Sequence, residues 1–133
     1  MRTAEMITTH PGEIGLDRDL LARAIDALVA CSQACTACAD ACLSEEMVDQ
    51  LRTCIRTNLD CADVCDTTAR VLSRQTAYNA DVTRALLQAC IQVCRTCGNE
   101  CASHADHHEH CRICAEACRA CEQACSELLA AIS

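Results

Sequence analysis

Hydrophobic and polar residues alternate with a helical period along most of the chain. Apolar residues or cysteines follow one another at alternating steps of three and four, as between Leu21 and Cys42 and between Leu87 and Cys101. Such steps keep the residues on one face of an α-helix. The positions between them carry mostly Asp, Glu, Arg, Gln, Ser, Thr and Ala, as a solvent-facing surface does. The pattern therefore predicts helices that each bury one narrow stripe.

Four such helices are predicted, separated by short links. They cover approximately residues 17–43, 45–74, 79–103 and 107–131. Asp17 and Ser44 are suitable caps for the first two helices, and Asn79 or Asp81 for the third. Short links place consecutive helices side by side and antiparallel. The predicted fold class is therefore all-α, an up-down-up-down four-helix bundle that takes residues 17–133.

Residues 1–16 are predicted to be a loose N-terminal extension of this bundle. They contain neither the apolar region nor the small-residue cleavage site of a secretory signal. The expected location is therefore the cytoplasm, where glutathione and thioredoxin keep thiols reduced.

Cysteine dominates the composition: the chain has 16 among 133 residues, and Tyr78 is its only aromatic residue. All of the cysteines fall on the four predicted stripes: Cys31, Cys35, Cys38, Cys42, Cys54, Cys61, Cys65, Cys90, Cys94, Cys97, Cys101, Cys111, Cys114, Cys118, Cys121 and Cys125. Cysteine is too small to fill a core of this size by itself, so a purely structural role explains the pattern poorly. The interior is predicted to hold something besides side chains.

The cysteines are predicted to gather toward one end of the bundle. The links at 44–46 and 103–107 share this end, and the cysteines occupy the part of the bundle next to it. The opposite end carries apolar residues: Leu20, Leu21, Ile25, Leu28, Val71, Leu72, Val82, Leu86, Leu87, Leu128, Leu129 and Ile132. The bundle is therefore predicted to combine a thiol-lined tube with an apolar plug.

A buried array of thiols is typical of soft-metal binding, because thiolates select Cu(I), Zn(II) or iron–sulfur clusters. Structural zinc sites usually draw their ligands from turns, whereas the CxxC pairs here, such as Cys35/Cys38, lie within predicted helices. The ferredoxin run of cysteines that ends in proline is missing, since the one proline is Pro11. Cu(I) accepts two or three sulfur ligands, and seven CxxxC pairs each place two thiols on one helix face. The spacing favours Cu(I).

Charge balance predicts the amount of metal. Metal binding deprotonates the thiols, and buried thiolates need compensating charge, so about one Cu(I) per cysteine is expected. Divalent zinc would require about half as many ions. A zinc or general soft-metal buffer and, less favoured, an iron–sulfur electron-transfer protein are the alternatives. A thiol redox enzyme would place CxxC in a βαβ context, and no open catalytic position is apparent, so no enzymatic activity is expected.

The segment HADHHEHC, residues 104–111, supplies histidines at the thiol-rich end. His104 continues the stripe of the third helix, and His107 and His108 lie four and three residues before the next cysteine. Because imidazole binds copper, these three histidines are candidate ligands that capture the ion and pass it to the thiols. His110 directly precedes that cysteine and is expected to face outward.

Two further residues are candidate metal ligands. Asn58 stands where a cysteine would complete the stripe of the second helix, and its side-chain oxygen could line a copper cluster. A buried Asn that fixes helix register is the alternative. Met47 is predicted on the same stripe at the thiol-rich end, where its thioether is a soft ligand.

The chain is acidic, with 19 Asp and Glu against 11 basic residues and a formal net charge of −8. It contains no basic run, which argues against nucleic acid as a partner. No stretch is expected to be long and apolar enough to span a membrane. Acidic residues near the thiol-rich end would favour the approach of cations.

The motifs CSQACTACADAC, CIQVCRTCGNEC, CRICAEACRACEQAC and CIRTNLDCADVC resemble those of the bacterial copper storage proteins. The resemblance covers the chain from Asp17 onward and implies a four-helix bundle that assembles as a homotetramer and fills its core with Cu(I). The absence of a signal sequence and the histidine-rich end are similar to the cytosolic branch of the family. The implied role is storage that limits copper toxicity or supplies cuproenzymes, with a copper chaperone as a candidate partner.

Overall fold

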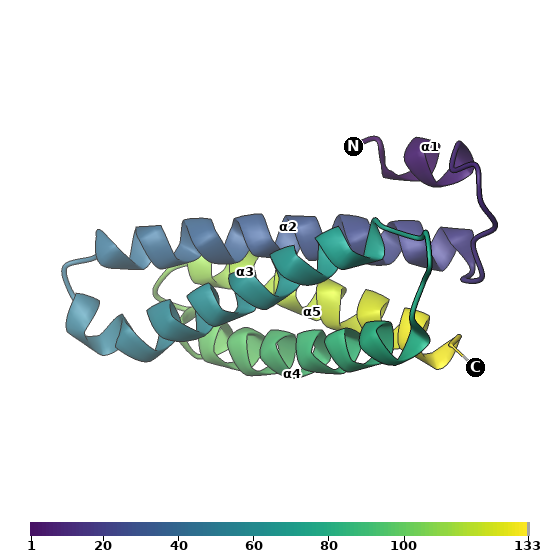
Figure 1. Cartoon of the computed structure of the whole chain (residues 1–133). Coiled ribbons are helices and arrows are strands. Elements are labelled where there is room, and N and C mark those ends of the chain that lie inside the picture. The colour runs from purple at the N-terminus through teal and green to yellow at the C-terminus, as the bar shows by residue number, and fades with distance from the viewer. Residues whose placement is uncertain (133) are drawn as a thin grey trace.

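The computed structural model describes residues 1–132, which form helices joined by short connections (Figure 1). In chain order the elements are α1 (Thr3–Thr8), α2 (Arg18–Leu43), the 3-10 helix η1 (Val48–Leu51), α3 (Arg52–Leu72), α4 (Ala80–His104) and α5 (Glu109–Ala130). No strand occurs within these described residues. The prediction of an all-α fold is confirmed.

Helices α2 to α5 form an antiparallel bundle around one interior. α2 packs against α3 and α5, and α4 packs against the same two helices, so the four helices close a ring (Figure 1). The connections at 44–51 and 105–108 lie at one end of the bundle, and the connection at 73–79 lies at the other (Figure 1). The predicted up-down-up-down topology is therefore confirmed.

Side-chain caps start two of the long helices. The carboxylate of Asp17 accepts a hydrogen bond from the backbone N–H of Leu20 at 3.0 Å, as the sequence predicts. Asn79, rather than Asp81, caps α4, because its Oδ1 accepts bonds from two backbone N–H groups at 2.9 and 3.1 Å. The prediction that Ser44 caps the next helix is wrong. Ser44 ends α2, and a turn and η1 come before α3.

The N-terminal extension is more ordered than predicted. Residues 3–8 form α1, which packs against α2 and buries Ile7. The hydroxyl of Thr3 donates a hydrogen bond to Asp26 on α2, and Leu16 is buried ahead of the bundle. The expectation of a loose segment is therefore wrong for this helix, because one buried side chain and one polar contact hold it in place.

The apolar plug fills the end of the bundle that carries the 73–79 connection. Its centre consists of leucines with at most 1% exposure: Leu21, Leu28, Leu72, Leu87 and Leu128. Ile25 is also buried, whereas Val82 is 49% exposed and lies outside the plug, contrary to the prediction. Each fully buried leucine stabilises the fold by about 1.5–3 kcal/mol through the hydrophobic effect. The plug therefore holds together a bundle whose remaining core is made mostly of thiols.

Helix α2 is long and apolar enough to cross a membrane when judged by length and composition alone. The expectation that no stretch reaches this level is wrong for α2, because its many alanines and cysteines raise its mean hydropathy. A core helix passes the same test, and the leucine and cysteine stripe of α2 is buried in the bundle.

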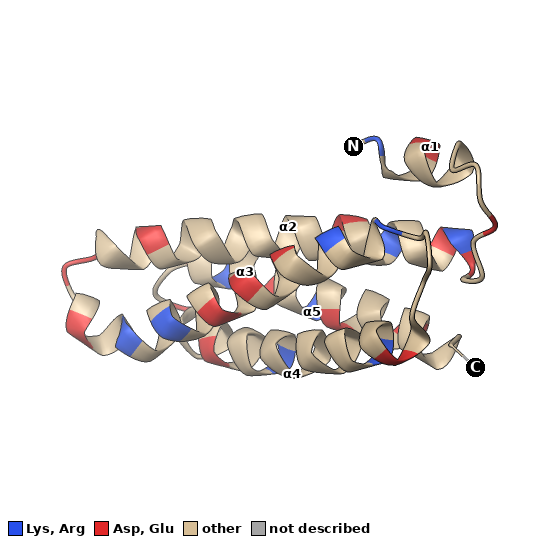
Figure 2. Ribbon diagram, viewed as in Figure 1, with Lys and Arg blue, Asp and Glu red and all other residues tan. Residues whose placement is uncertain are grey.

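Acidic and basic residues are interspersed along the helices (Figure 2).

Candidate metal centre

The interior next to the plug is lined with thiols. All 16 cysteines are free, and none exceeds 2% exposure. The lining comes from all four long helices, because the cysteine stripes of α2, α3, α4 and α5 face the bundle axis. We call this region the sulfur tube. The structure therefore places every cysteine where the sequence pattern predicts it.

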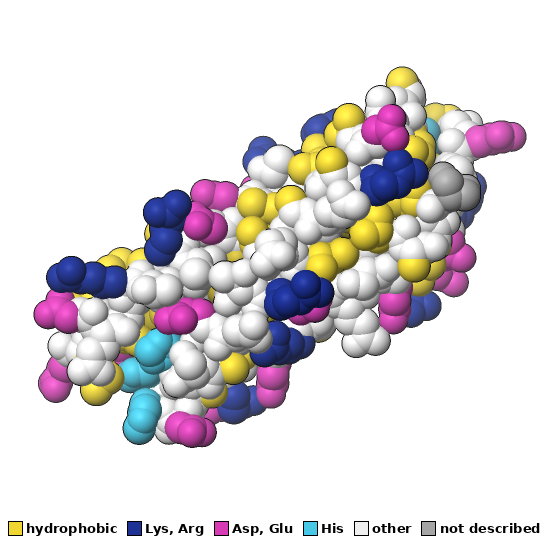
Figure 3. Space-filling model, turned by 90° about the horizontal axis from the view of Figure 1, so that it is seen from below, with side chains coloured by type: hydrophobic (Ala, Val, Ile, Leu, Met, Phe, Trp, Pro, Cys, Tyr) yellow, Lys and Arg dark blue, Asp and Glu magenta, His cyan; other side chains and the backbone are white. Residues whose placement is uncertain are grey.

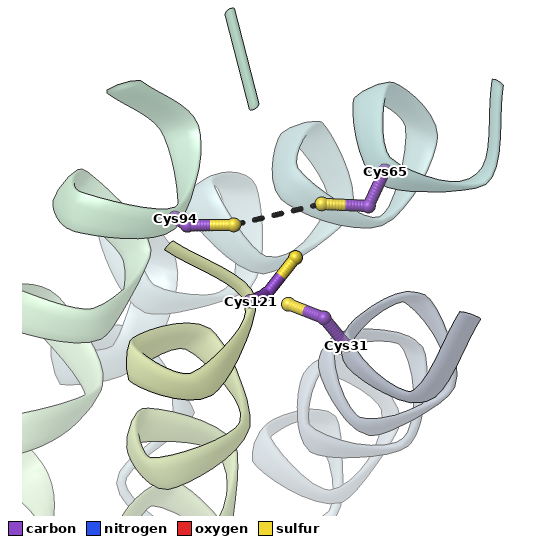
Figure 4. Close-up of side chains that lie close together, drawn as sticks. All are labelled: Cys31, Cys65, Cys94 and Cys121. Carbon is purple, nitrogen blue, oxygen red and sulfur yellow. Dashed lines mark hydrogen bonds between the residues drawn. The ribbon is translucent and has the colours of Figure 1, made fainter. Parts of the chain in front are cut away.

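The sulfur atoms lie in overlapping groups whose members are all within 4.8 Å of one another. These groups include Cys31/Cys65/Cys94/Cys121, Cys31/Cys35/Cys61/Cys118, Cys35/Cys97/Cys114/Cys118, Cys38/Cys42/Cys54/Cys111 and Cys38/Cys101/Cys114. In the first group each thiol comes from a different helix, and the four side chains point toward one another (Figure 4). Shared members such as Cys31, Cys35 and Cys38 link neighbouring groups, so the tube offers a continuous column of sulfur.

Contacts between helices are as short as those within one helix. The i,i+4 pair Cys31/Cys35 has its sulfurs 3.8 Å apart, so the two thiols lie close together on one helix face, as the CxxxC spacing predicts. Across the bundle, Cys65 Sγ lies 3.6 Å from Cys94 Sγ, and Cys35 Sγ lies 3.7 Å from Cys118 Sγ. A metal ion in the tube would therefore meet thiols from two or more helices.

Burial keeps two of the outer thiols, Cys42 and Cys111, protonated in the absence of metal. Loss of hydration raises the pKa of Cys42 to about 11 and also raises the pKa of Cys111. Because these thiols are neutral at pH 7, a metal that binds them must displace their protons.

Asn58 occupies the gap in the cysteine stripe of α3 and is fully buried. Its Oδ1 accepts hydrogen bonds from the thiols of Cys97, Cys101 and Cys114 at 3.0, 3.3 and 3.1 Å. Its Nδ2 donates to Cys54 Sγ at 3.6 Å. The amide thus lies among thiols from three helices, a placement consistent with a role in lining a cluster.

A buried polar side chain marks the end of the tube at the plug. Thr68 is fully buried, and its hydroxyl donates to the carbonyl of Val64 at 2.8 Å. The thiol of Cys90 donates to the same hydroxyl oxygen at 3.0 Å. Beyond Thr68 the α3 stripe continues with Leu72, so Thr68 marks the boundary between sulfur and hydrocarbon.

Histidine side chains gather at the end of the bundle opposite the plug, next to acidic side chains (Figure 3). We call this end, residues 44–47 and 104–110, the mouth. The three predicted histidine ligands differ in their surroundings there. His104 Nε2 lies 3.2 Å from Glu100 Oε1, and His107 is exposed. His108 is buried, with Nδ1 2.7 Å from Glu45 Oε2.

His110 faces the tube, so the expectation that it points outward is wrong. Its Nδ1 lies 3.4 Å from Cys38 Sγ and 3.6 Å from Cys111 Sγ. Burial opposes protonation of His110, but hydrogen bonds with Cys38 and Glu45 outweigh it and raise the pKa above the usual value for histidine. The signal was present in the sequence, because His110 precedes Cys114 by four residues and therefore shares its helix face.

Met47 does not lie on the inward stripe of α3. It stands in the turn before η1, and 44% of it is exposed. The predicted stripe extends too far toward the N-terminus, because α3 begins only at Arg52. The first buried apolar residue after the turn is Leu51. Met47 thus belongs to the mouth rather than to the tube.

The sequence model that describes copper storage proteins matches residues 17–130, which is most of the chain. The chain therefore belongs to the copper storage protein family. A cysteine-rich protein of Bacillus subtilis, YhjQ, whose function is uncharacterized, is 32% identical over 106 residues, or 80% of this chain and 93% of that protein.

Solved structures of the Streptomyces lividans copper storage protein Ccsp are similar over nearly the whole chain. The structure loaded with 10 copper equivalents is 62% identical, with a TM-score of 0.96 over 97% of this chain and 98% of that one. A second structure, described as a cytosolic copper storage protein with five coppers, is 65% identical and has a TM-score of 0.85 over 86% of this chain and 96% of that one. Fold and sequence therefore agree with the resemblance stated from the motifs.

Proposed function

We propose that this protein stores Cu(I) as a column of thiolate-bound ions inside the sulfur tube. The observation that carries the proposal is the set of overlapping thiol groups, each within 4.8 Å, contributed by free and buried cysteines. Thiolates select Cu(I), and a thiolate that belongs to two groups can bridge two neighbouring ions. Membership in the copper storage protein family supports the same cargo.

The number of Cu(I) ions that the tube can hold follows from the charge of its thiolates. Each Cu(I) that replaces a thiol proton leaves the buried charge unchanged, so about one ion per cysteine keeps the core neutral. The Streptomyces lividans relative has been loaded with 10 copper equivalents, which supports a capacity of many ions per chain. A zinc or mixed soft-metal buffer is the second candidate, supported by the four-thiol groups that could surround one divalent ion.

The tube is filled from the mouth in this proposal. Cys38, Cys42, Cys54 and Cys111 form the outermost thiol group, and His110 adds an imidazole nitrogen beside it. His104, His107, His108 and Met47 are the remaining proposed capture residues, each offering a nitrogen or a thioether at this end. Asn58 is proposed to line the clusters further in, because its oxygen already faces three thiols.

The role is one of storage rather than catalysis. An ion in the tube would be surrounded by buried thiols, so no coordination position would remain for a substrate. This supports a protein without enzymatic activity. The cytosolic location described for the Streptomyces lividans relative supports the same location here. Residues 17–133 are proposed as the copper-binding domain and residues 1–16 as its extension. Assembly as a homotetramer and delivery by a copper chaperone are proposed from the family resemblance.

An anaerobic titration of the reduced protein with Cu(I), in competition with a chromogenic chelator, tests this function. If the proposal is correct, the chelator stays metal-free until about one equivalent per cysteine has been added. Transfer of copper to the chelator after only a few equivalents would contradict storage. Saturation by zinc at about half the number of cysteines, with tighter binding than copper, would favour the buffer instead.

A further inference from the structure

Glu45 connects the two histidines that line the inner side of the mouth. It lies in the turn after α2, and its Oε2 is 2.7 Å from His108 Nδ1 and 2.9 Å from His110 Nε2. The two imidazole rings stack with centroids 5.5 Å apart and an interplanar angle of 21°. One carboxylate oxygen thus faces a different ring nitrogen in each of two adjacent histidines.

This geometry determines where each ring carries its hydrogen. An ionised carboxylate only accepts hydrogen bonds, so each nitrogen that faces Glu45 must be an N–H. Neutral His110 then carries hydrogen on Nε2 and keeps a lone pair on Nδ1. Neutral His108 carries hydrogen on Nδ1 and keeps its lone pair on Nε2. A single carboxylate therefore selects opposite tautomers in the two rings.

The free lone pair of His110 faces the outermost thiols. Nδ1 lies 3.4 Å from Cys38 Sγ and 3.6 Å from Cys111 Sγ, and both cysteines belong to the outermost thiol group. If the ring turned over about its Cβ–Cγ bond, a C–H group would take the place of Nδ1, and no nitrogen lone pair would face the thiols. Copper binding by His110 thus depends on the ring orientation that Glu45 stabilises.

We propose that Glu45 is the positioning residue of the mouth, which fixes the tautomer and orientation of His110 so that Nδ1 is presented to Cu(I) next to Cys38 and Cys111. Partners that hold the second nitrogen of a ligating histidine commonly act in this way. His108, stacked on His110 and bound to the same oxygen, restricts the other face of the ring. This role rests on the proposed copper storage.

The tautomers are measured first in the metal-free protein, by nitrogen-15 NMR of the histidine side chains at a pH above the pKa of His110. We expect Nε2–H in His110 and Nδ1–H in His108. The result for His108 is the more telling, because Nε2–H is the commoner tautomer of an imidazole in water. Glu45→Ala should return His108 to Nε2–H, whereas Glu45→Gln, which keeps an acceptor oxygen, should retain both tautomers. Glu46→Ala, at an exposed neighbouring position, is the matched control.

Copper binding is then compared among the same proteins. Glu45→Ala should bind the copper next to His110 about 10-fold to 100-fold more weakly, as removal of an outer partner usually does. Glu45→Gln and Glu46→Ala should stay close to the wild type. Unchanged tautomers and copper affinity in Glu45→Ala would overturn the role of Glu45, and so would an equal loss in Glu46→Ala. Failure of the wild type to take up copper would instead overturn the storage proposal, which the NMR experiment does not require.

Discussion

His110 joins the surface of the protein to its thiol-lined interior. It is the histidine that contacts both a thiol of α2 and a thiol of α5, through Cys38 and Cys111. We expect His110→Ala to weaken or slow the capture of copper at the outermost thiol group by about 10-fold or more, since a lost ligand should cost at least as much as a lost outer partner. Competition with a chelator and stopped-flow absorption at low copper ratios would measure the effect.

His107→Ala is the comparison variant, because His107 is an exposed capture residue of the same mouth. It should weaken the capture of copper by less than His110→Ala does. A larger loss in His107→Ala than in His110→Ala would show that capture occurs on the outer side of the mouth.

Asn58 offers a test, at a single position, of the rule that each buried thiolate binds about one Cu(I). In Asn58→Cys a thiol would complete the stripe of α3 among Cys54, Cys97 and Cys114. Because each buried thiolate needs one compensating ion, the capacity should rise by about one Cu(I) per chain. Ser126→Cys is the control, since an exposed thiol outside the tube should not add a tightly held ion. Equal capacities in both variants would contradict the rule.

At the scale of elements, the plug rather than the tube should determine the stability of the metal-free bundle. Leu87 is fully buried on α4, and Leu87→Ala should lower the free energy of unfolding by about 2–5 kcal/mol. Leu59→Ala on the 45% exposed position of α3 should change it by about 0.5 kcal/mol or less. Urea denaturation followed by circular dichroism would measure both. A loss of similar size in the two variants would contradict the assignment of the plug.

Periodicity predicted most of these elements, and the exceptions have physical causes. The stripes predict the inward face of each long helix, and the structure confirms this face for every cysteine. α1 has only six residues and no repeated stripe, so no period could reveal it. The turn ahead of α3 depends on how the chain reverses at the mouth, and this turn places Met47 outside the inward stripe of α3. The predicted outward direction of His110 is wrong because its contact with α2 is tertiary, although its four-residue spacing to Cys114 indicates the inward face.

At the scale of the whole molecule, the metal-free protein should become less stable as the pH rises above 9. The folded state raises the pKa of Cys42 from 9.0 to about 11. Between these values the unfolded chain has already lost the proton while the folded chain keeps it, so stability that is complete below pH 9 is lost as the pH approaches 11. Thermal melting across this range would test it. The copper-loaded protein should lack this dependence, because its thiols are already deprotonated.

The central claim is that copper fills the interior of the bundle, and a crystal structure of the Cu(I)-loaded protein with anomalous data at the copper edge tests it most directly. The account predicts copper atoms between the helices from the level of Cys38 and Cys42 at the mouth to the level of Cys90 and Cys125 at the plug, each bound by thiolates of two or more helices. Copper confined to the histidines of the mouth or to the outer surface, with the inner thiols unbound at saturation, would contradict it.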